Sequence, residues 1–451
     1  MVDLYIRNGK IITEETTFNG GVTVEDGKIK QLISGNAEIP AKEVIDLNGK
    51  FLLPGVIDEH CHWSEPGRDW EGYTTGSMAA AAGGITTAID MPLNDLPPMI
   101  SKERFQNKVE LTKDKAVIDY AFWGGIIDDN FSDLEGQHQE GVVGFKAFMV
   151  TASDYGKVTD GMLYAGLKKM KEMGNLIGVH AENEPVNTYL KKQFIQQGRT
   201  DRSIWPESRP PEAELEAIKR AIYWAKASGG RLVVLHISTA DGIRAVTQAK
   251  MEGADVFAEV CAHYLCFDNN DYLAVGPELR CAPPLRSSEN LDELWNLVLN
   301  GQIDAIASDH SPCPPEMQDI GYTDIWKAFG GITGNQVLLP AIISEGVHKR
   351  GLSWPKLVKL MCSNPARIFG MYPTKGAMVP GADADFAIVD PDKEWVLEAS
   401  DLFNRHKHSA YVGRTFKGKV IQTIVRGETV FKEGTIIAQP GFGKLVKRKS
   451  F

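Results

Sequence analysis

Two histidines separated by one cysteine, His60 and His62, follow the apolar segment KFLLPGVI and could bind a metal ion. Side chains two residues apart on a strand point to the same side, so both imidazoles can face one ion. A His-x-His pair supplies only two ligands, however, and metal sites in proteins use three or four. The pair therefore predicts a metal site only if other parts of the chain supply further ligands.

Further residues of the ligand type stand in or after other apolar segments. His180 ends NLIGVH, His236 ends RLVVLH, Asp309 follows IDAIAS, and Lys146 lies within GVVGFKAFMV. If these segments are strands of one parallel barrel, their carboxyl ends form one face and bring the side chains together. A single buried histidine is common in protein cores, but six such groups at strand ends indicate a metal centre.

The lysine is an unusual member of this set, because an ammonium group repels divalent cations. Burial lowers the pKa of a lysine and favours the neutral amine. A neutral amine adds carbon dioxide to become a carbamate, whose two oxygens and negative charge suit a position between two metal ions. We therefore expect carboxylated Lys146 to bridge two divalent ions. One ion would be held by His60, His62 and Asp309, and the other by His180 and His236.

The pattern of apolar segments predicts the elements that position these residues. Between residues 53 and 374, strand-like runs alternate with helix-like stretches, and eight such strands are the count of a (β/α)8 barrel of the TIM type. Nearly continuous apolar strands also fit a parallel sheet covered by helices. The proline-rich segment 182–211 is too long for a simple connection, so we expect an insertion near the barrel mouth.

The two ends of the chain, residues 1–52 and 375–451, carry short alternating apolar segments instead. Asn-Gly and Asp-Gly pairs favour the tight turns of β-hairpins, because these residues tolerate a positive φ. Such pairs occur at Asn8-Gly9, Asp26-Gly27 and Asn48-Gly49. We therefore predict one small β-sandwich domain formed from both ends, beside a barrel domain of residues 53–374.

Composition argues against several classes of partner. The 451 residues include 49 basic and 59 acidic ones, for a formal charge of -10, with no basic stripe that would follow a phosphate backbone. There is no run of about 18 apolar residues and no signal-peptide pattern, so we expect a cytoplasmic protein without nucleic-acid or membrane partners. The six cysteines form no C-x-x-C pair, and we expect them to be reduced and structural.

This set of features resembles the cyclic amidohydrolases of the amidohydrolase superfamily over essentially the whole chain. The resemblance is carried by HxH after the first barrel strand, the lysine of the fourth, the histidines after the fifth and sixth, and the aspartate after the eighth. Within that family, the segments HWSEPGRDWEGY, MPLN and SDHSPC are most similar to the allantoinases. This implies hydrolysis of the hydantoin ring of (S)-allantoin to allantoate in purine degradation, by a homotetramer.

Two alternatives stay open. Hydantoinases and dihydropyrimidinases share the metal framework and act on other cyclic amides. Metal-free relatives of dihydropyrimidinase serve as protein-binding scaffolds, and the six filled ligand positions of this chain argue against that class.

The resemblance also implies residues that bind a small-molecule substrate. Dihydroorotases place an arginine that holds the substrate carboxylate where this chain has Ser64, so we expect a ring without a carboxylate. Main-chain groups around Ala282 and Thr333 correspond to those that bind the ring in the family. Asn94 and His263 stand at strand ends and are further candidates, with a turn role and a packing or ligand-orienting role as their alternatives.

Opening a ring amide requires a nucleophile and a proton for the departing nitrogen. Two divalent ions lower the pKa of bound water, so no serine or cysteine nucleophile is required. Asp309 can accept the proton of that water and pass it to the ring nitrogen, and its alternative role is that of a ligand only. The donor set suits zinc, with cobalt, manganese or iron as alternatives. His310 would point away from this site on a strand, so we expect it to be structural.

Overall fold

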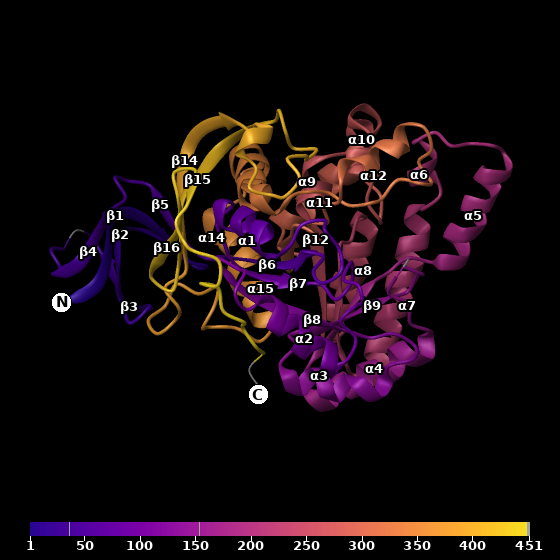
Figure 1. Ribbon diagram of the computed structural model, residues 1–451, viewed down its shortest axis with the longest axis horizontal. Coiled ribbons are helices and arrows are strands. Elements are labelled where there is room, and N and C mark those ends of the chain that lie inside the picture. The colour runs from indigo at the N-terminus through magenta and orange to yellow at the C-terminus, as the bar shows by residue number, and fades with distance from the viewer. Residues whose placement is uncertain (36, 153, 449–451) are drawn as a thin grey trace.

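The computed structural model describes residues 1–35, 37–152 and 154–448, and its centre is an eight-stranded parallel barrel (Figure 1). A backbone bridge between Cys61 and His310 joins the first strand to the segment after the last. Ser308 reinforces this seam, because its backbone N–H and its hydroxyl both donate to the Asp58 carboxylate, at 3.0 and 2.6 Å. The predicted fold class is thereby confirmed. The barrel strands are β6 (Val56–Cys61), β7 (Ile85–Asp90), β8 (Asp119–Gly125), β9 (Gly144–Phe148), β10 (Leu176–His180), β11 (Arg231–Val234), β12 (Val256–Cys261) and β13 (Ala305–Ala307).

Helices cover the outside of the barrel, and α4 (Asp160–Met173) shows why they form. Thr159 caps its first turn by accepting a hydrogen bond from the backbone N–H of Met162, and Gly174 ends it in the left-handed conformation at φ 62°. The buried face repeats at helical spacing through Leu163, Leu167 and Met170. The other long helices are α1 (Tyr73–Ala82), α2 (Lys102–Thr112), α7 (Pro211–Ser228), α8 (Ala240–Met251) and α11 (Ser288–Leu299). Shorter helices are α3 (Leu134–Glu140), α9 (Ala262–Cys266), α10 (Asn269–Val275), α12 (Pro315–Asp319), α13 (Leu338–Ile342), α14 (Trp354–Val358) and α15 (Asn364–Ile368).

The segment between β10 and α7 forms two extra helices, α5 (Glu184–Gln196) and α6 (Ile204–Glu207). They lie at the end of the molecule opposite the N-terminus (Figure 1). The indole N–H of Trp205 donates to the carbonyl of Cys281 at 2.7 Å, and that of Trp326 donates to the carbonyl of Arg199 at 2.9 Å. These bonds fix the insertion to the loops after β12 and β13, at the carboxyl end of the barrel.

Both ends of the chain build a second, nine-stranded mixed sheet, in which β14 pairs antiparallel with β5. Its apolar core includes Ile6, Val22 and Leu52 from the N-terminal part and Phe386 and Ile424 from the C-terminal part. The strands are β1 (Val2–Ile12), β2 (Thr17–Glu25), β3 (Lys28–Ser34), β4 (Ala41–Asp46), β5 (Phe51–Pro54), β14 (Phe386–Val396), β15 (Thr415–Val425), β16 (Glu428–Lys432) and β17 (Thr435–Ile436).

Only one of the three predicted hairpin turns in this region joins a hairpin. Asp26 and Gly27, with φ 50° and 71°, connect the paired strands β2 and β3. Asn48 begins a turn, but β4 and β5, on either side of it, each pair in parallel with β1. The prediction at Asn8 was wrong, because its positive φ of 57° belongs to an irregularity inside β1, where pairing with β2 shifts register.

All six cysteines are buried and free. In the described part of the chain, no helix has the length and apolar character needed to cross a bilayer.

Candidate metal centre

The carboxyl ends of the barrel strands enclose a cavity that all six predicted metal ligands line. Five strands position them. One histidine lies in β6 and another directly follows it, and each of β9, β10, β11 and β13 either contains one further residue or is closely followed by it. The residues are His60, His62, Lys146, His180, His236 and Asp309.

Asp309 lies between the two histidines of the HxH motif. Its Oδ1 atom is 3.2 Å from His60 Nε2 and 3.3 Å from His62 Nε2. Burial raises the pKa of Asp309, but the charges of His60, His62 and His236 lower it by more, so the net pKa is well below its ordinary value. Three donor atoms within 4.8 Å of one another, one of them an ionised carboxylate, fit the ligand shell of one divalent ion.

The other two histidines lie beside this group. The rings of His180 and His236 are 4.5 Å apart between centroids, and the ring of His236 is 5.4 Å from that of His60. Phe148 stacks on His180 at 5.0 Å and fixes the plane of its ring. His236 Nδ1 is buried without a hydrogen-bond partner. A second group of nitrogen donors thus adjoins the first.

Lys146 is 1% exposed and comes from β9, between the strands that carry the other ligands. Burial lowers its pKa to about 8, although Asp309 and Glu259 act in the opposite direction. Burial is the main reason why the pKa values of His62 and His236 are lowered, and the charge of Lys146 is a smaller one. The amine therefore lies close to both groups of histidines. The neutral amine that carboxylation requires is therefore accessible near neutral pH.

Two of the candidate ligands have backbone conformations that are unusual for residues other than glycine. His236 has φ 38° and Asp309 has φ 46°. A non-glycine residue in this region costs about 1–3 kcal/mol and persists where the surroundings enforce it. The Glu259 carboxylate accepts the backbone N–H of His236 at 3.0 Å, and the seam at Ser308 precedes Asp309. The left-handed turns direct both side chains into the cavity.

Two buried glutamates orient histidines of the candidate metal site, and neither was predicted from the sequence. Glu259 Oε1 accepts from His60 Nδ1 at 2.7 Å in addition to binding the backbone of His236. Glu182 Oε2 accepts from His180 Nε2 at 2.6 Å, which leaves Nδ1 of that ring for a metal, and Arg209 pairs with the same oxygen. Such carboxylates fix the tautomer of a ligand histidine. An acid inside the apolar strand DVFAEVC was the available signal for Glu259.

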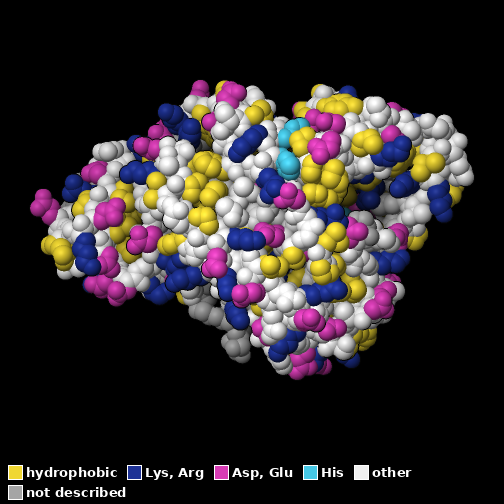
Figure 2. Space-filling view, viewed as in Figure 1, with side chains coloured by type: hydrophobic (Ala, Val, Ile, Leu, Met, Phe, Trp, Pro, Cys, Tyr) yellow, Lys and Arg dark blue, Asp and Glu magenta, His cyan; other side chains and the backbone are white. Residues whose placement is uncertain are grey.

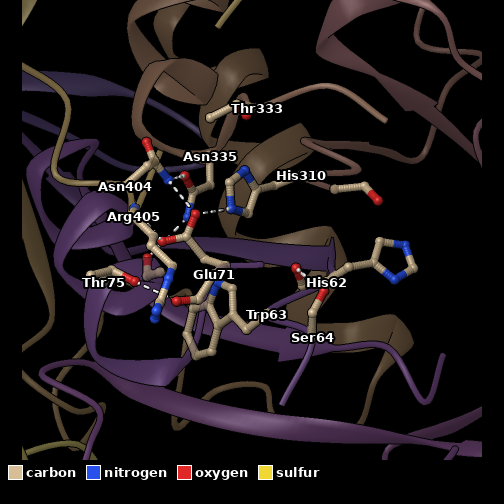
Figure 3. Close-up of polar contacts among 12 residues, drawn as sticks. His62, Trp63, Ser64, Glu71, Thr75, His310, Thr333, Asn335, Asn404 and Arg405 are labelled. Carbon is tan, nitrogen blue, oxygen red and sulfur yellow. Dashed lines mark hydrogen bonds and ion pairs between the residues drawn. The ribbon is translucent and has the colours of Figure 1, made fainter. Parts of the chain in front are cut away.

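A third glutamate, Glu71, supports the centre through His310, whose ring points away from the cavity as predicted (Figure 3). The carbonyl of His310 accepts the backbone N–H of His62 at 2.7 Å. Its ring is held on both sides, since Nδ1 accepts from the backbone of Gly334 at 3.2 Å and Nε2 lies 3.5 Å from Glu71 Oε2. The His310 ring thereby sets the position of the backbone that carries His62.

The segment between β14 and β15 completes this support (Figure 3). Glu71 Oε1 accepts the backbone N–H of Arg405 at 2.9 Å, and Oε2 accepts from the side-chain amide of Asn404 at 3.3 Å. Asn404 also donates to Asn335 Oδ1 at 3.1 Å. The C-terminal part of the chain therefore contacts the loops that hold the candidate metal ligands.

Glu71→Gln should weaken metal binding and lower turnover by about 10-fold to 100-fold, the usual range for residues that support metal ligands. The amide keeps the shape of the carboxylate, but it has one acceptor oxygen in place of two. It cannot keep the contacts with the His310 ring, the Arg405 backbone N–H and the Asn404 amide together. Metal content after dialysis against a chelator, together with kcat, checks this. Glu43→Gln, on exposed β4, is the matched control. Wild-type metal retention and turnover in Glu71→Gln would show that the contact does not support the site.

The predicted substrate-binding residues fall into two groups. Asn94 and Ala282 line the cavity, and the side-chain amide of Asn94 donates to the Ser311 hydroxyl at 3.2 Å. Three others are not among the lining residues. Ser64 and His263 are buried, and the carbonyl of Thr333 accepts a hydrogen bond from Ser409 at 2.7 Å.

Comparison with known proteins identifies the relatives of this architecture. Residues 51–430 match the amidohydrolase family. The chain belongs to the amidohydrolase family. It is 42% identical over 448 residues to a protein of Escherichia coli O1:K1 / APEC named allantoinase. That alignment covers 97% of this chain and 98% of the relative. An allantoinase of Salmonella newport (strain SL254) is also 42% identical, over 95% of both chains.

Solved structures agree with this assignment. The L-hydantoinase (dihydropyrimidinase) from Arthrobacter aurescens superposes with a TM-score of 0.97 and 36% identity, over 99% of this chain and 100% of its own. The dihydropyrimidinase from Brevibacillus agri NCHU1002 has a TM-score of 0.93 and 33% identity, over 100% and 99%. The family is metal-dependent, and this amidohydrolase has groups of buried side chains suited to bind metal.

Proposed function

We propose that this amidohydrolase is an allantoinase, which opens the hydantoin ring of allantoin to give allantoate. The observation that carries the proposal is the 42% identity, across 97% of the chain, to a relative of that name. The segments HWSEPGRDWEGY, MPLN and SDHSPC support the same assignment.

The lining of the cavity supports a substrate ring without a carboxylate. Among the described residues around it, Lys146 is the sole lysine or arginine, and it is buried with the ligand histidines. A ring that carries a carboxylate would need a free cation for its charge. Asn94, Ser311 and the backbone near Ala282 and Gly331 offer neutral hydrogen-bonding groups instead.

We further propose that the cavity holds two divalent ions, with zinc as the metal expected first. His60, His62 and Asp309 would hold one ion, His180 and His236 the other, and carboxylated Lys146 would lie between them. Such ions lower the pKa of bound water and polarise the ring carbonyl. The buried, partnerless His236 Nδ1 and the lowered pKa of Lys146 support this arrangement.

The side chains then have separate roles. Asp309, ionised in the resting site, can accept a proton at its carboxylate and deliver it to the departing ring nitrogen. Glu182 and Glu259 keep the imidazoles oriented, while Asn94 and the backbone near Ala282 position the ring. We propose residues 53–374 as the catalytic domain, residues 1–52 and 375–451 as the β-sandwich domain, and a homotetramer as the assembly.

Allantoin is expected to exceed hydantoin, dihydrouracil and dihydroorotate by at least about 100-fold in kcat/KM. A site that hydrogen-bonds to the polar ureido arm of allantoin has unsatisfied polar groups when a ring without that arm is bound. Such unsatisfied groups discriminate strongly between substrates. Metal-analysed protein assayed with all four rings provides the measurement. The high structural similarity to L-hydantoinase makes hydantoin the main competitor. Equal turnover of hydantoin or dihydrouracil would replace the allantoinase assignment by a hydantoinase or dihydropyrimidinase one.

A further inference from the structure

A second cavity, of about 800 Å³, adjoins the metal cavity and shares Phe329 and Gly330 with it. The insertion forms one side of it through α5 and Trp205, and the loop after β13 forms another. Figure 2 shows a hollow on this side of the molecule with Lys and Arg side chains at its rim. Nothing in the proposed mechanism uses this second cavity.

Four cations line the second cavity, and the most buried of them lacks a counterion. Arg280 is 9% exposed, and its Nε has no hydrogen-bond partner. Its guanidinium lies over the Trp205 ring, 3.6 Å from the centroid. Across the described residues, no carboxylate forms an ion pair with it. A buried charge without a partner is costly, which indicates a place for an anion.

The neighbouring cations add to this positive charge. Lys191 reaches the cavity from α5, over Trp326, and within the described chain no acid pairs with it. Arg209 is partly neutralised by Glu182. Burial, and after it the charge of Arg209, lower the pKa of Arg280 to about 9, as expected for like charges held together.

The acids of the second cavity do not balance these charges. Glu184 is engaged by Lys157 and Thr151 and forms no ion pair with Arg280 in the described part of the chain. Glu316 is exposed on α12. The fourth cation of the lining, Lys327, pairs with Asp324 at 3.1 Å. The uncompensated charge is therefore concentrated at Arg280 and Lys191.

The proposed reaction produces the anion that such a site would take. Hydrolysis breaks the ring C–N bond and forms a C–O bond. The carbonyl becomes a carboxylate, one proton goes to the departing nitrogen, and one is released. A neutral ring thus enters, and a singly charged acid leaves.

We propose that Arg280, Lys191 and Arg209 form a carboxylate-binding site that takes the ring-opened product as it leaves the metal cavity. This inference rests on the proposed function for the identity of the product. The charge and geometry of the site do not depend on it. Arg209 links the two cavities, because it contacts Glu182, which holds the ligand His180.

Calorimetric titration of the metal-loaded enzyme tests the site, with the metals saturated by acetohydroxamate so that carboxylates cannot bind them. Allantoate and succinate are the two probes. We expect one allantoate to bind per chain, and Arg280→Gln to weaken that binding by about 10-fold to 100-fold, the range for a lost charge-assisted hydrogen bond. Arg244→Gln, an exposed ion-paired arginine on α8, is the matched control and should bind as the wild type does.

A second variant tests the site independently if Arg280→Gln fails to fold. Lys191→Gln changes an exposed side chain on α5 and should also weaken allantoate binding by several-fold. Succinate that binds as tightly as allantoate would overturn the product role and assign the site to another carboxylate. No binding with the metals blocked, or equal binding by wild type and both variants, would overturn the site. A failure to hydrolyse allantoin would overturn the proposed function alone, and the succinate titration would still test the cations.

Discussion

Replacement of Lys146 by alanine is expected to remove nearly all turnover and most of the bound metal. Lys146 is the sole lysine or arginine among the described residues of the metal cavity, and it adjoins both groups of histidines. If it bridges two ions as a carbamate, alanine removes two oxygen ligands and one negative charge together. The remaining histidines and Asp309 would then hold two dications close together with little charge to offset their repulsion.

Chemical rescue distinguishes a bridging carbamate from a merely structural lysine. Acetate, propionate or formate should restore part of the turnover and metal content of Lys146→Ala, because a short carboxylate can occupy the space of the carbamate. Lys168→Ala, exposed on α4, is the matched control and should neither lose activity nor respond to carboxylates. Carbon-13 NMR of enzyme loaded with labelled bicarbonate should show the carbamate directly. Fully active, metal-loaded enzyme with an unmodified Lys146 would contradict the proposal.

The fold and the grouping of the six candidate ligands around one cavity could be predicted because their signals are local. A histidine at the end of an apolar run is visible in the sequence, and parallel barrel topology brings all such strand ends to one face. The conformations that direct the side chains are not visible in this way. Nothing in RLVVLH or ASDH indicates that His236 and Asp309 adopt φ values of 38° and 46°. Those angles depend on contacts with Glu259 and on the barrel seam.

The supporting residues were missed because their partners are distant in the sequence. Glu71 and Asn404 are 333 residues apart, and the bond between them exists only once the C-terminal segment packs on the barrel. Arg209 comes from the insertion, and its contact with Glu182 follows from the path of that insertion. The three cations of the proposed carboxylate site come from α5, the segment before α7 and the loop before α11. Side chains gathered in this way give no local spacing that a sequence pattern could reveal.

The structure of the site makes Asp309 a stronger candidate for proton transfer than any other cavity residue. Its Oδ1 lies beside His60 and His62, and its side chain is 15% exposed, whereas those of the two histidines are 1% and 6% exposed. Glu182 and Glu259 are 1% and 0% exposed and are occupied by histidine contacts. Asp154, the other acid that lines the cavity, is paired with Arg68. Asp309 is therefore the acid beside the candidate metal ligands that a substrate can reach.

Asp309→Asn should retain measurable metal and lower kcat by about 100-fold to 10,000-fold, the range for lost general acid–base catalysis. The amide oxygen can still bind an ion, but the amide cannot accept a proton near neutral pH. Metal content and kcat measured on the same preparation separate the two roles. Asp129→Asn, exposed in the loop after β8, is the matched control. Loss of metal in proportion to turnover would make Asp309 a ligand only, and near wild-type turnover in the loaded variant would assign proton transfer to another group.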